Sequence, residues 1–225
     1  MADEFPIFLE ELLTAITIVR GTYLSGPMQM LLYGGIDAMA YYAMPATNPD
    51  GTPKEDVKSA DFIDWVNKYL LPGSSMECTA EEVYAARCSW LHSHGFQARL
   101  NRMTSARMIC YANAGREVAE MNRRFNQTNP THTAVFVDQD EMLLRFFAGA
   151  RACWQDIQFD PAMRANAENR LRTGGAGLLV FSGQDVRRVS SLDGLFEERA
   201  RNSLDSVRRV RKWLHGPDYD WPPAF

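Results

Sequence analysis

Residues 79–95, "TAEEVYAARCSWLHSHG", contain the strongest helix signals in the chain. Thr79 and Glu82 form a T-x-x-E capping box, in which the hydroxyl and the carboxylate each bind an exposed backbone N–H group at the start of a helix. Gly95 suits a helix end, because glycine readily adopts the left-handed conformation that closes the last turn. The sequence therefore predicts a helix over about residues 80–94.

Similar patterns predict a mainly helical chain on both sides of this segment. Apolar spacing and capping residues indicate helices at about residues 4–19, 59–71, 114–125, 139–157, 161–172 and 195–214, and one that begins near Pro27. The 195–214 helix is amphipathic, with a basic stretch from Arg208 to Trp213. β-branched and aromatic residues predict short strands at 106–112, 132–138 and 177–182. We therefore expect one mainly α domain over residues 1–225, with a small accessory sheet in the 106–182 region.

The composition is that of an ordinary globular protein, but the charge is unevenly distributed. The chain has 225 residues, of which 46% are hydrophobic and 23% charged, and its net charge is −4. Residues 87–124 nevertheless contain seven arginines against only Glu117 and Glu120. A basic segment of this kind attracts anionic ligands even when the total charge is negative.

The remaining signals favour a cytoplasmic protein without a metal or cofactor. The N-terminus is acidic, unlike a secretory signal. The apolar residues 27–44 include Asp37, which is costly in lipid, so a buried helix is expected instead of a membrane span. No close Cys pair forms a metal or redox motif, and reduced, mostly buried thiols are expected at Cys78, Cys88, Cys110 and Cys153.

Arg87 and His92 are candidates for RNA cleavage. That reaction without a metal needs a general base for the ribose 2′-OH, a general acid for the leaving 5′-oxygen, and a cation for the phosphate. Histidine transfers protons near neutral pH, and arginine is a permanent phosphate donor. The spacing alone is weak evidence, because Arg209 and His215 also match an R-x(4–6)-H pattern. A solvated arginine and a surface histidine are the simpler alternative.

The spacing also poses a geometric problem. Residues five apart on a regular α-helix point about 140° away from each other. An unwound last turn or a long arginine reach would bring Arg87 and His92 together. A two-fold dimer would also help, because two helix ends could then pool their side chains in one cleft.

The runs "YAARCSWLHSH" and "LNRMTSARMICYAN" resemble a group of uncharacterised bacterial proteins with a Y-A-A-R-C-x-x-L-H core. The R-x(4)-H pattern near a helix end is similar to the signature of the HEPN superfamily (higher eukaryotes and prokaryotes nucleotide-binding domains). This resemblance covers about residues 69–113. It implies a helical bundle that acts as a metal-independent endoribonuclease, usually a homodimer and often part of toxin–antitoxin or antiphage systems. Cys88 stands where many members have a polar residue.

Carried over to this chain, the resemblance implies that Arg87 and His92 are catalytic. We expect further substrate contacts from His94, Arg99, Arg102 and Arg107, whose positive charges could follow an RNA backbone. The expected partners are RNA, a second copy of the chain and an antitoxin or regulatory protein, with no membrane. Two alternatives stay open: a non-catalytic RNA- or protein-binding module of the same fold, and a structural helical subunit that docks through its last helix.

Overall fold

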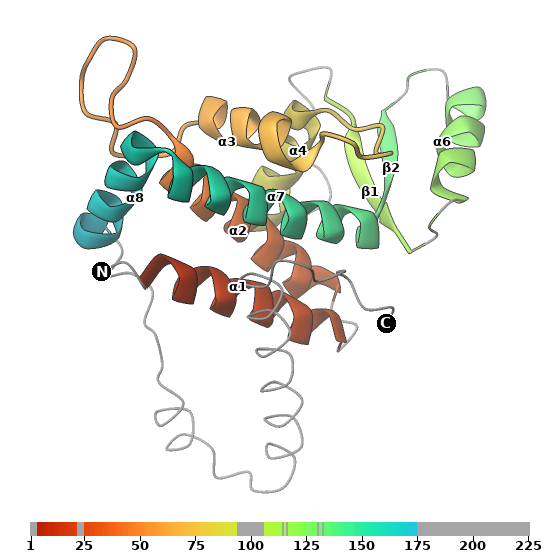
Figure 1. Ribbon diagram of the computed structural model, residues 1–225. Helices are drawn as coiled ribbons and strands as arrows, with labels where there is room; N and C mark the ends of the chain where they lie inside the picture. The colour runs from red at the N-terminus through yellow and green to blue at the C-terminus, as the bar shows by residue number, and fades with distance from the viewer. Residues whose placement is uncertain are drawn as a thin grey trace, which may run out of the picture. The chain divides into compact units, whose positions relative to one another are not determined.

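The computed structural model (Figure 1) describes residues 4–21, 25–93, 106–113, 115, 117–129, 131 and 133–174. Its elements are, in chain order, α1 (Glu4–Gly21), α2 (Ser25–Ala43), α3 (Ser59–Trp65), η1 (Val66–Leu70), α4 (Ala80–Cys88), η2 (Ser89–Ser93), β1 (Met108–Ala112), α6 (Glu117–Thr128), β2 (Ala134–Asp138), α7 (Gln139–Phe159) and α8 (Pro161–Gly174). The predicted mainly α class with a small sheet is confirmed. The predicted strand at 177–182 and helix at 195–214 lie outside the described residues.

The chain divides into two compact units. One unit comprises Met1–Met28 and Ala165–Phe225, and its described part includes α1 with the buried side chains of Leu9, Leu13 and Ile16. The other unit is Gln29–Arg164 and contains the sheet and most of the helices. All the residues that matter for the candidate site belong to the Gln29–Arg164 unit.

Two helices of this unit begin with side-chain caps, as the sequence predicts. The Thr79 N–H donates to Glu82 at 2.9 Å, and the Glu82 N–H donates to the Thr79 hydroxyl at 3.3 Å, which completes the capping box of α4. At the start of α7, Asp138 accepts from the Glu141 N–H at 2.8 Å. The Glu141 carboxylate, however, binds the backbone N–H and the hydroxyl of Ser75, so it anchors the preceding loop.

Two segments predicted as uniform α-helices end in π-helical turns. The predicted helix at 59–71 is α3 followed by η1, where the Leu71 N–H donates to the Val66 carbonyl five residues back at 3.0 Å. The predicted helix at 80–94 is likewise α4 followed by η2. Such i→i+5 turns are rare and occur often at functional sites. The expected stop at Gly95 is outside the part of the chain that the structure describes.

A close approach between α7 and η1 fixes the core of the unit. Gly149 of α7 lies so near η1 that a Cβ at this position would stand 2.6 Å from the Tyr69 carbonyl oxygen. Around this contact, the side chains of Trp65, Leu70, Phe146 and Phe147 are buried. The Phe146 ring packs at tilted angles against the rings of Trp65 and Phe147. Glycine is therefore required here for space, and the backbone carbonyl cannot move away without unwinding the helix.

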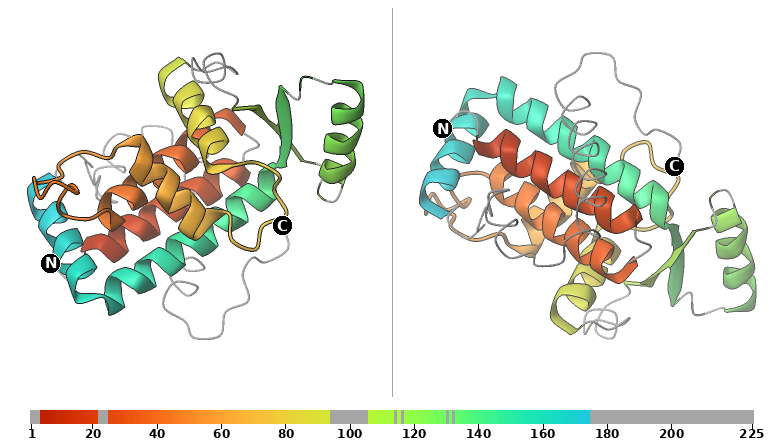
Figure 2. Two further views of the ribbon diagram at one scale, coloured as in Figure 1. Left: turned by 90° about the horizontal axis from the view of Figure 1, so that it is seen from above. Right: turned by 90° about the horizontal axis from the view of Figure 1, so that it is seen from below.

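The sheet is a small β1–α6–β2 unit. β1 and β2 pair in parallel, with Met108 opposite Ala134 and Ala112 opposite Asp138. Both views in Figure 2 show α6 at β2, away from the core helices. From α6 the buried Asn122 amide donates to the Phe136 carbonyl at 2.9 Å and accepts from its N–H at 2.7 Å. No third strand is described beside β2, and the Asn122 amide instead binds backbone groups of this strand. Because unpaired strand edges invite aggregation, this binding protects β2.

Two further expectations concern membranes and thiols. None of the described helices combines the length and the apolarity that a membrane span requires.

Cys78 and Cys153 are buried, whereas Cys88 and Cys110 are half-buried, and all four are free thiols. Burial raises the pKa of both Cys78 and Cys153 to about 12.

A pair of glycine variants tests the close approach of α7 to η1. Alanine normally stabilises a helix by about 0.5–1 kcal/mol relative to glycine. Gly34→Ala in α2, where no atom lies within 4 Å of the new methyl group, should show that gain. Gly149→Ala should instead lower the free energy of unfolding by about 1–3 kcal/mol, because its methyl group overlaps the Tyr69 carbonyl. Equal stabilisation of both variants in denaturant unfolding would contradict the packing.

Alkylation rates test the buried thiols. The thiolate reacts with iodoacetamide, and a thiol with a pKa near 12 is ionised only to about one part in 10⁴ at mildly alkaline pH. Cys78 and Cys153 should therefore label far more slowly in the native protein than in urea, and the rate should rise with pH. Mass spectrometry of tryptic peptides would measure each site. Native labelling of either residue at the rate seen in urea would show that it is not buried.

Candidate functional site

Arg87 lies at the end of α4 and is held by Asp37 of α2. Its Nε and Nη2 atoms donate to the same oxygen, Oδ2 of Asp37, at 2.8 and 2.6 Å. The Arg87 side chain is 21% exposed and the Asp37 side chain 23%, so the pair is mostly covered but solvent still reaches it. Two donors to one carboxylate oxygen fix the plane of the guanidinium as well as its position.

The surroundings keep Arg87 charged. Partial burial lowers its pKa, but the hydrogen bonds and the charge of Asp37, with a smaller contribution from Cys88, outweigh burial and raise it. The guanidinium carbon also lies 6.0 Å from the ring centre of Tyr84, one turn earlier on α4, at the outer limit of a cation–π contact. Tyr84 in turn packs edge-on against Phe62 of α3, with the ring centres 5.5 Å apart. A carboxylate and an aromatic ring thus orient this arginine.

Arg87 and His92 lie on one continuous helical segment, with η2 following α4 directly. Residues five apart diverge by about 140° on a regular α-helix. A π-helical turn closes with i→i+5 bonds and is wider than an α-helical turn, so residues five apart diverge less in it. The sequence indicates no such π-helical turn.

Arg107, predicted to contact substrate, forms an ion pair within the fold. Its Nε donates to Glu82 at 2.6 Å, and one Nη atom donates to Glu82 at 3.0 Å and to the Glu77 carbonyl at 2.6 Å. The Arg107 backbone N–H also donates to Glu82 at 3.1 Å. Glu82, only 4% exposed, therefore caps α4 and anchors the start of β1 with one carboxylate.

The other predicted substrate residues are not placed. His94, Arg99 and Arg102 lie outside the described residues, so their roles stay predictions. Arg107 as a phosphate contact also stays a prediction, and an RNA phosphate would have to compete with Glu82 for its guanidinium. Of the predicted contacts, the side chains of Arg87 and Arg107 are therefore the two whose surroundings the structure describes.

Asp37 is the site residue that sequence reasoning missed. Its carboxylate sits in a helix whose neighbouring side chains, Tyr33, Ile36 and Ala40, are fully or almost fully buried. A charge in such surroundings is costly unless an opposite charge pairs with it. A single acidic residue within an apolar segment was therefore a sign that Asp37 needs a positively charged partner. The sequence does not identify that partner, because Arg87 lies fifty positions along the chain and meets Asp37 only in the folded protein.

Comparisons of the chain with protein-family models, curated proteins and solved structures find no match. The chemistry of the site therefore rests on its residue types and their geometry. The site offers a fixed, permanently charged guanidinium close to a histidine-bearing π-helical turn. A fixed cation of this kind suits the binding of a phosphate or another oxyanion.

A double-mutant cycle tests whether Asp37 holds Arg87. We expect Asp37→Asn and Arg87→Gln each to lower the free energy of unfolding by about 1–3 kcal/mol, since each leaves a partly buried charge without its partner. The double variant should lose less than the sum, with a coupling energy of about 1–2 kcal/mol.

The exposed pair of Arg124 and Glu120 on α6 is a matched control. Its two single variants and the double variant should behave additively in the same denaturant titration, because solvent screens exposed charges. Strict additivity at Asp37 and Arg87 as well would show that the two side chains do not interact in solution.

Proposed function

We propose that the chain is a metal-independent endoribonuclease of HEPN type, in which Arg87 binds the scissile phosphate and His92 transfers a proton. The observation that carries this proposal is the fixed, partly exposed guanidinium of Arg87 on the helical segment that continues through His92. Asp37 acts as a positioning residue, because it fixes the guanidinium plane before RNA arrives. Preorganisation of this kind lowers the cost of binding developing charge.

The reaction needs no group beyond side chains and the RNA itself. A base removes the proton of the ribose 2′-OH, and the 2′-oxygen attacks phosphorus while an acid protonates the departing 5′-oxygen. The products are a 2′,3′-cyclic phosphate and a 5′-OH end. Arg87 would stabilise the extra negative charge on the phosphate oxygens during attack.

A homodimer would supply the second proton-transfer group. One chain brings one His92, and the reaction needs both an acid and a base. Two copies related by a two-fold axis would place a pair of His92 and a pair of Arg87 residues around one cleft. A cytoplasmic toxin or antiphage role, with an antitoxin or other regulator as partner, is part of the same proposal.

A non-catalytic RNA- or protein-binding module is the second candidate, and one observation favours it. Asp37 balances the charge of Arg87, and Glu82 balances that of Arg107. Two of the arginines that make residues 87–124 basic are therefore partly neutralised within the fold. Less charge is then left for RNA, whose backbone binding depends on neutralising phosphates.

Cleavage assays with variants separate these two functions. His92→Ala should reduce cleavage of a labelled single-stranded or structured RNA by a factor on the order of 10² to 10⁴ with little change in affinity, because proton transfer acts in the transition state. Arg87→Ala should reduce both cleavage and affinity. Arg124→Ala, an exposed arginine of α6, is the matched control and should change neither measurably.

The same reactions should proceed in EDTA and yield cyclic-phosphate ends. Activity that disappears on chelation and returns with magnesium would assign the chemistry to another site. Cleavage by His92→Ala at the wild-type rate would rule out the proposed proton transfer. RNA binding without any cleavage, alone or with a candidate regulator, would favour the binding module.

A further inference from the structure

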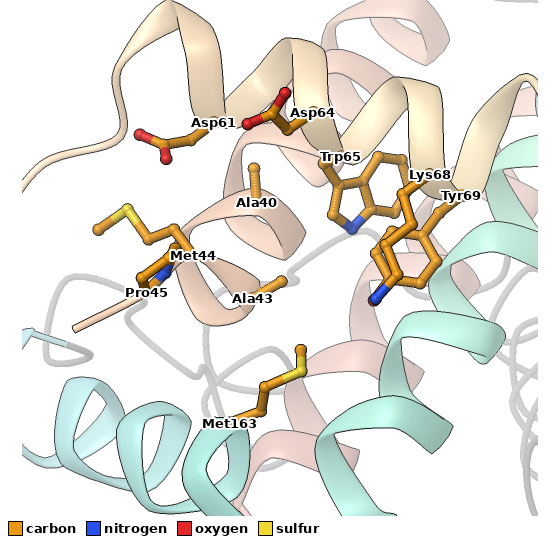
Figure 3. Close-up of a pocket in the computed structure, with 10 residues that line it drawn as sticks. All are labelled: Ala40, Ala43, Met44, Pro45, Asp61, Asp64, Trp65, Lys68, Tyr69 and Met163. Carbon is orange, nitrogen blue, oxygen red and sulfur yellow. The ribbon is translucent and has the colours of Figure 1, made fainter. Parts of the chain in front are cut away.

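A small open pocket lies between α2, α3 and the first turn of α8 (Figure 3). Its volume is about 150 Å³, and all its lining residues belong to the Gln29–Arg164 unit. Ala40 and Ala43 leave the space free, and the thioethers of Met44 and Met163 flank it. A cavity of this size holds a molecule such as benzene. The pocket is therefore large enough for a ligand of about six to nine non-hydrogen atoms.

The acidic rim of the pocket carries one unbalanced charge. The Asp61 carboxylate is bound by the Lys54 ammonium and by the Lys58 N–H, the latter at 2.9 Å, so its charge is compensated. Asp64, one turn further along α3, is exposed, and its carboxylate has no hydrogen bond or ion pair with any described residue. This side of the pocket therefore suits a positively charged group.

The opposite side offers hydrogen-bond donors. Lys68 lies in the pocket wall with its Nζ atom 2.8 Å from Asp156, and an ammonium group has three donors, so others can serve a ligand. Trp65 is 2% exposed, and its indole N–H makes no well-formed hydrogen bond with any described residue. The neighbouring Cys153 thiol is only a weak acceptor. Figure 3 shows the indole nitrogen on the ring edge nearer Lys68.

A buried donor whose only neighbouring acceptor is weak is uncommon and costs stability. Together, the indole N–H and the Lys68 ammonium favour binding of an acceptor that carries negative charge. Asp64 and Lys68 are four residues apart, so they lie on the same side of α3 and η1, about one helical turn from each other. That separation matches a ligand whose positive and negative groups are joined by one or two carbon atoms.

We propose that this pocket binds a small zwitterion of the α-amino acid type. Its ammonium group faces Asp64, and its carboxylate faces Lys68 and the Trp65 N–H. A short apolar side chain fills the space beside Ala43, between Met44 and Met163. The site involves neither Arg87 nor His92, so it is independent of the function proposed above.

Titration of the full chain with L-valine and L-leucine tests this site. The Trp65 indole N–H resonance, assigned by comparison with Trp65→Phe, should shift and saturate in a ¹H–¹⁵N spectrum at millimolar ligand. Isobutylamine lacks the carboxylate and isovalerate lacks the ammonium group, so each should bind at least about tenfold more weakly. Binding of isobutylamine as tight as that of L-valine would overturn the zwitterion and leave a plain amine site.

Two variants of exposed side chains assign the charged groups without disturbing the core. Asp64→Asn and Lys68→Gln should each weaken L-valine binding by about tenfold or more while melting near the wild-type temperature. Lys58→Gln, a lysine outside the pocket lining, is the matched control and should bind normally. Wild-type affinity in Asp64→Asn would overturn the proposal. So would an unshifted Trp65 resonance with both amino acids, which would mean that only water occupies the pocket.

Discussion

The ion pair between Asp37 and Arg87 joins α2 to α4. Asp37 stands among buried side chains of α2 and is itself mostly covered, so a carboxylate without a cation would cost about 1–3 kcal/mol there. Arg87 supplies that cation from the end of α4 with two short hydrogen bonds to one oxygen. The pairing therefore meets a structural requirement of α2 and fixes the orientation of the guanidinium at the end of α4.

The carboxylate of Glu82 connects α4 to the sheet in a similar way. It closes the first turn of α4, and it binds both the side chain and the backbone N–H of Arg107 just before β1. On the far side of the sheet, the Asn122 amide performs the matching role at Phe136 of β2. Two polar side chains from flanking helices thus bind backbone groups just before β1 and within β2. This explains how a two-stranded parallel sheet, marginal on its own, persists beside the helices.

Local signals in the sequence predicted the helices well because their causes are local. Thr79 and Glu82 cap the helix that they were expected to cap, and both described strands lie within the predicted ranges. The π-helical turns η1 and η2 could not be predicted, since no residue type is specific for them. The partners of Asp37 and Arg107 could not be predicted either, because both ion pairs depend on how distant elements pack. Arg107 illustrates the difficulty: its position in a basic segment suggested a phosphate contact, whereas its guanidinium binds Glu82.

We expect RNA phosphate to bind at the guanidinium that Asp37 holds. It can be observed directly as the Nε–Hε resonance of Arg87 in a ¹H–¹⁵N spectrum, assigned with Arg87→Lys. The titrant would be an RNA with 2′-O-methyl groups, which binds but cannot be cut. This resonance should shift and saturate together with RNA binding, and Asp37→Asn should alter its position in the free protein. An Arg87 resonance that stays unchanged while RNA saturates the protein would show that RNA phosphate does not bind at Arg87.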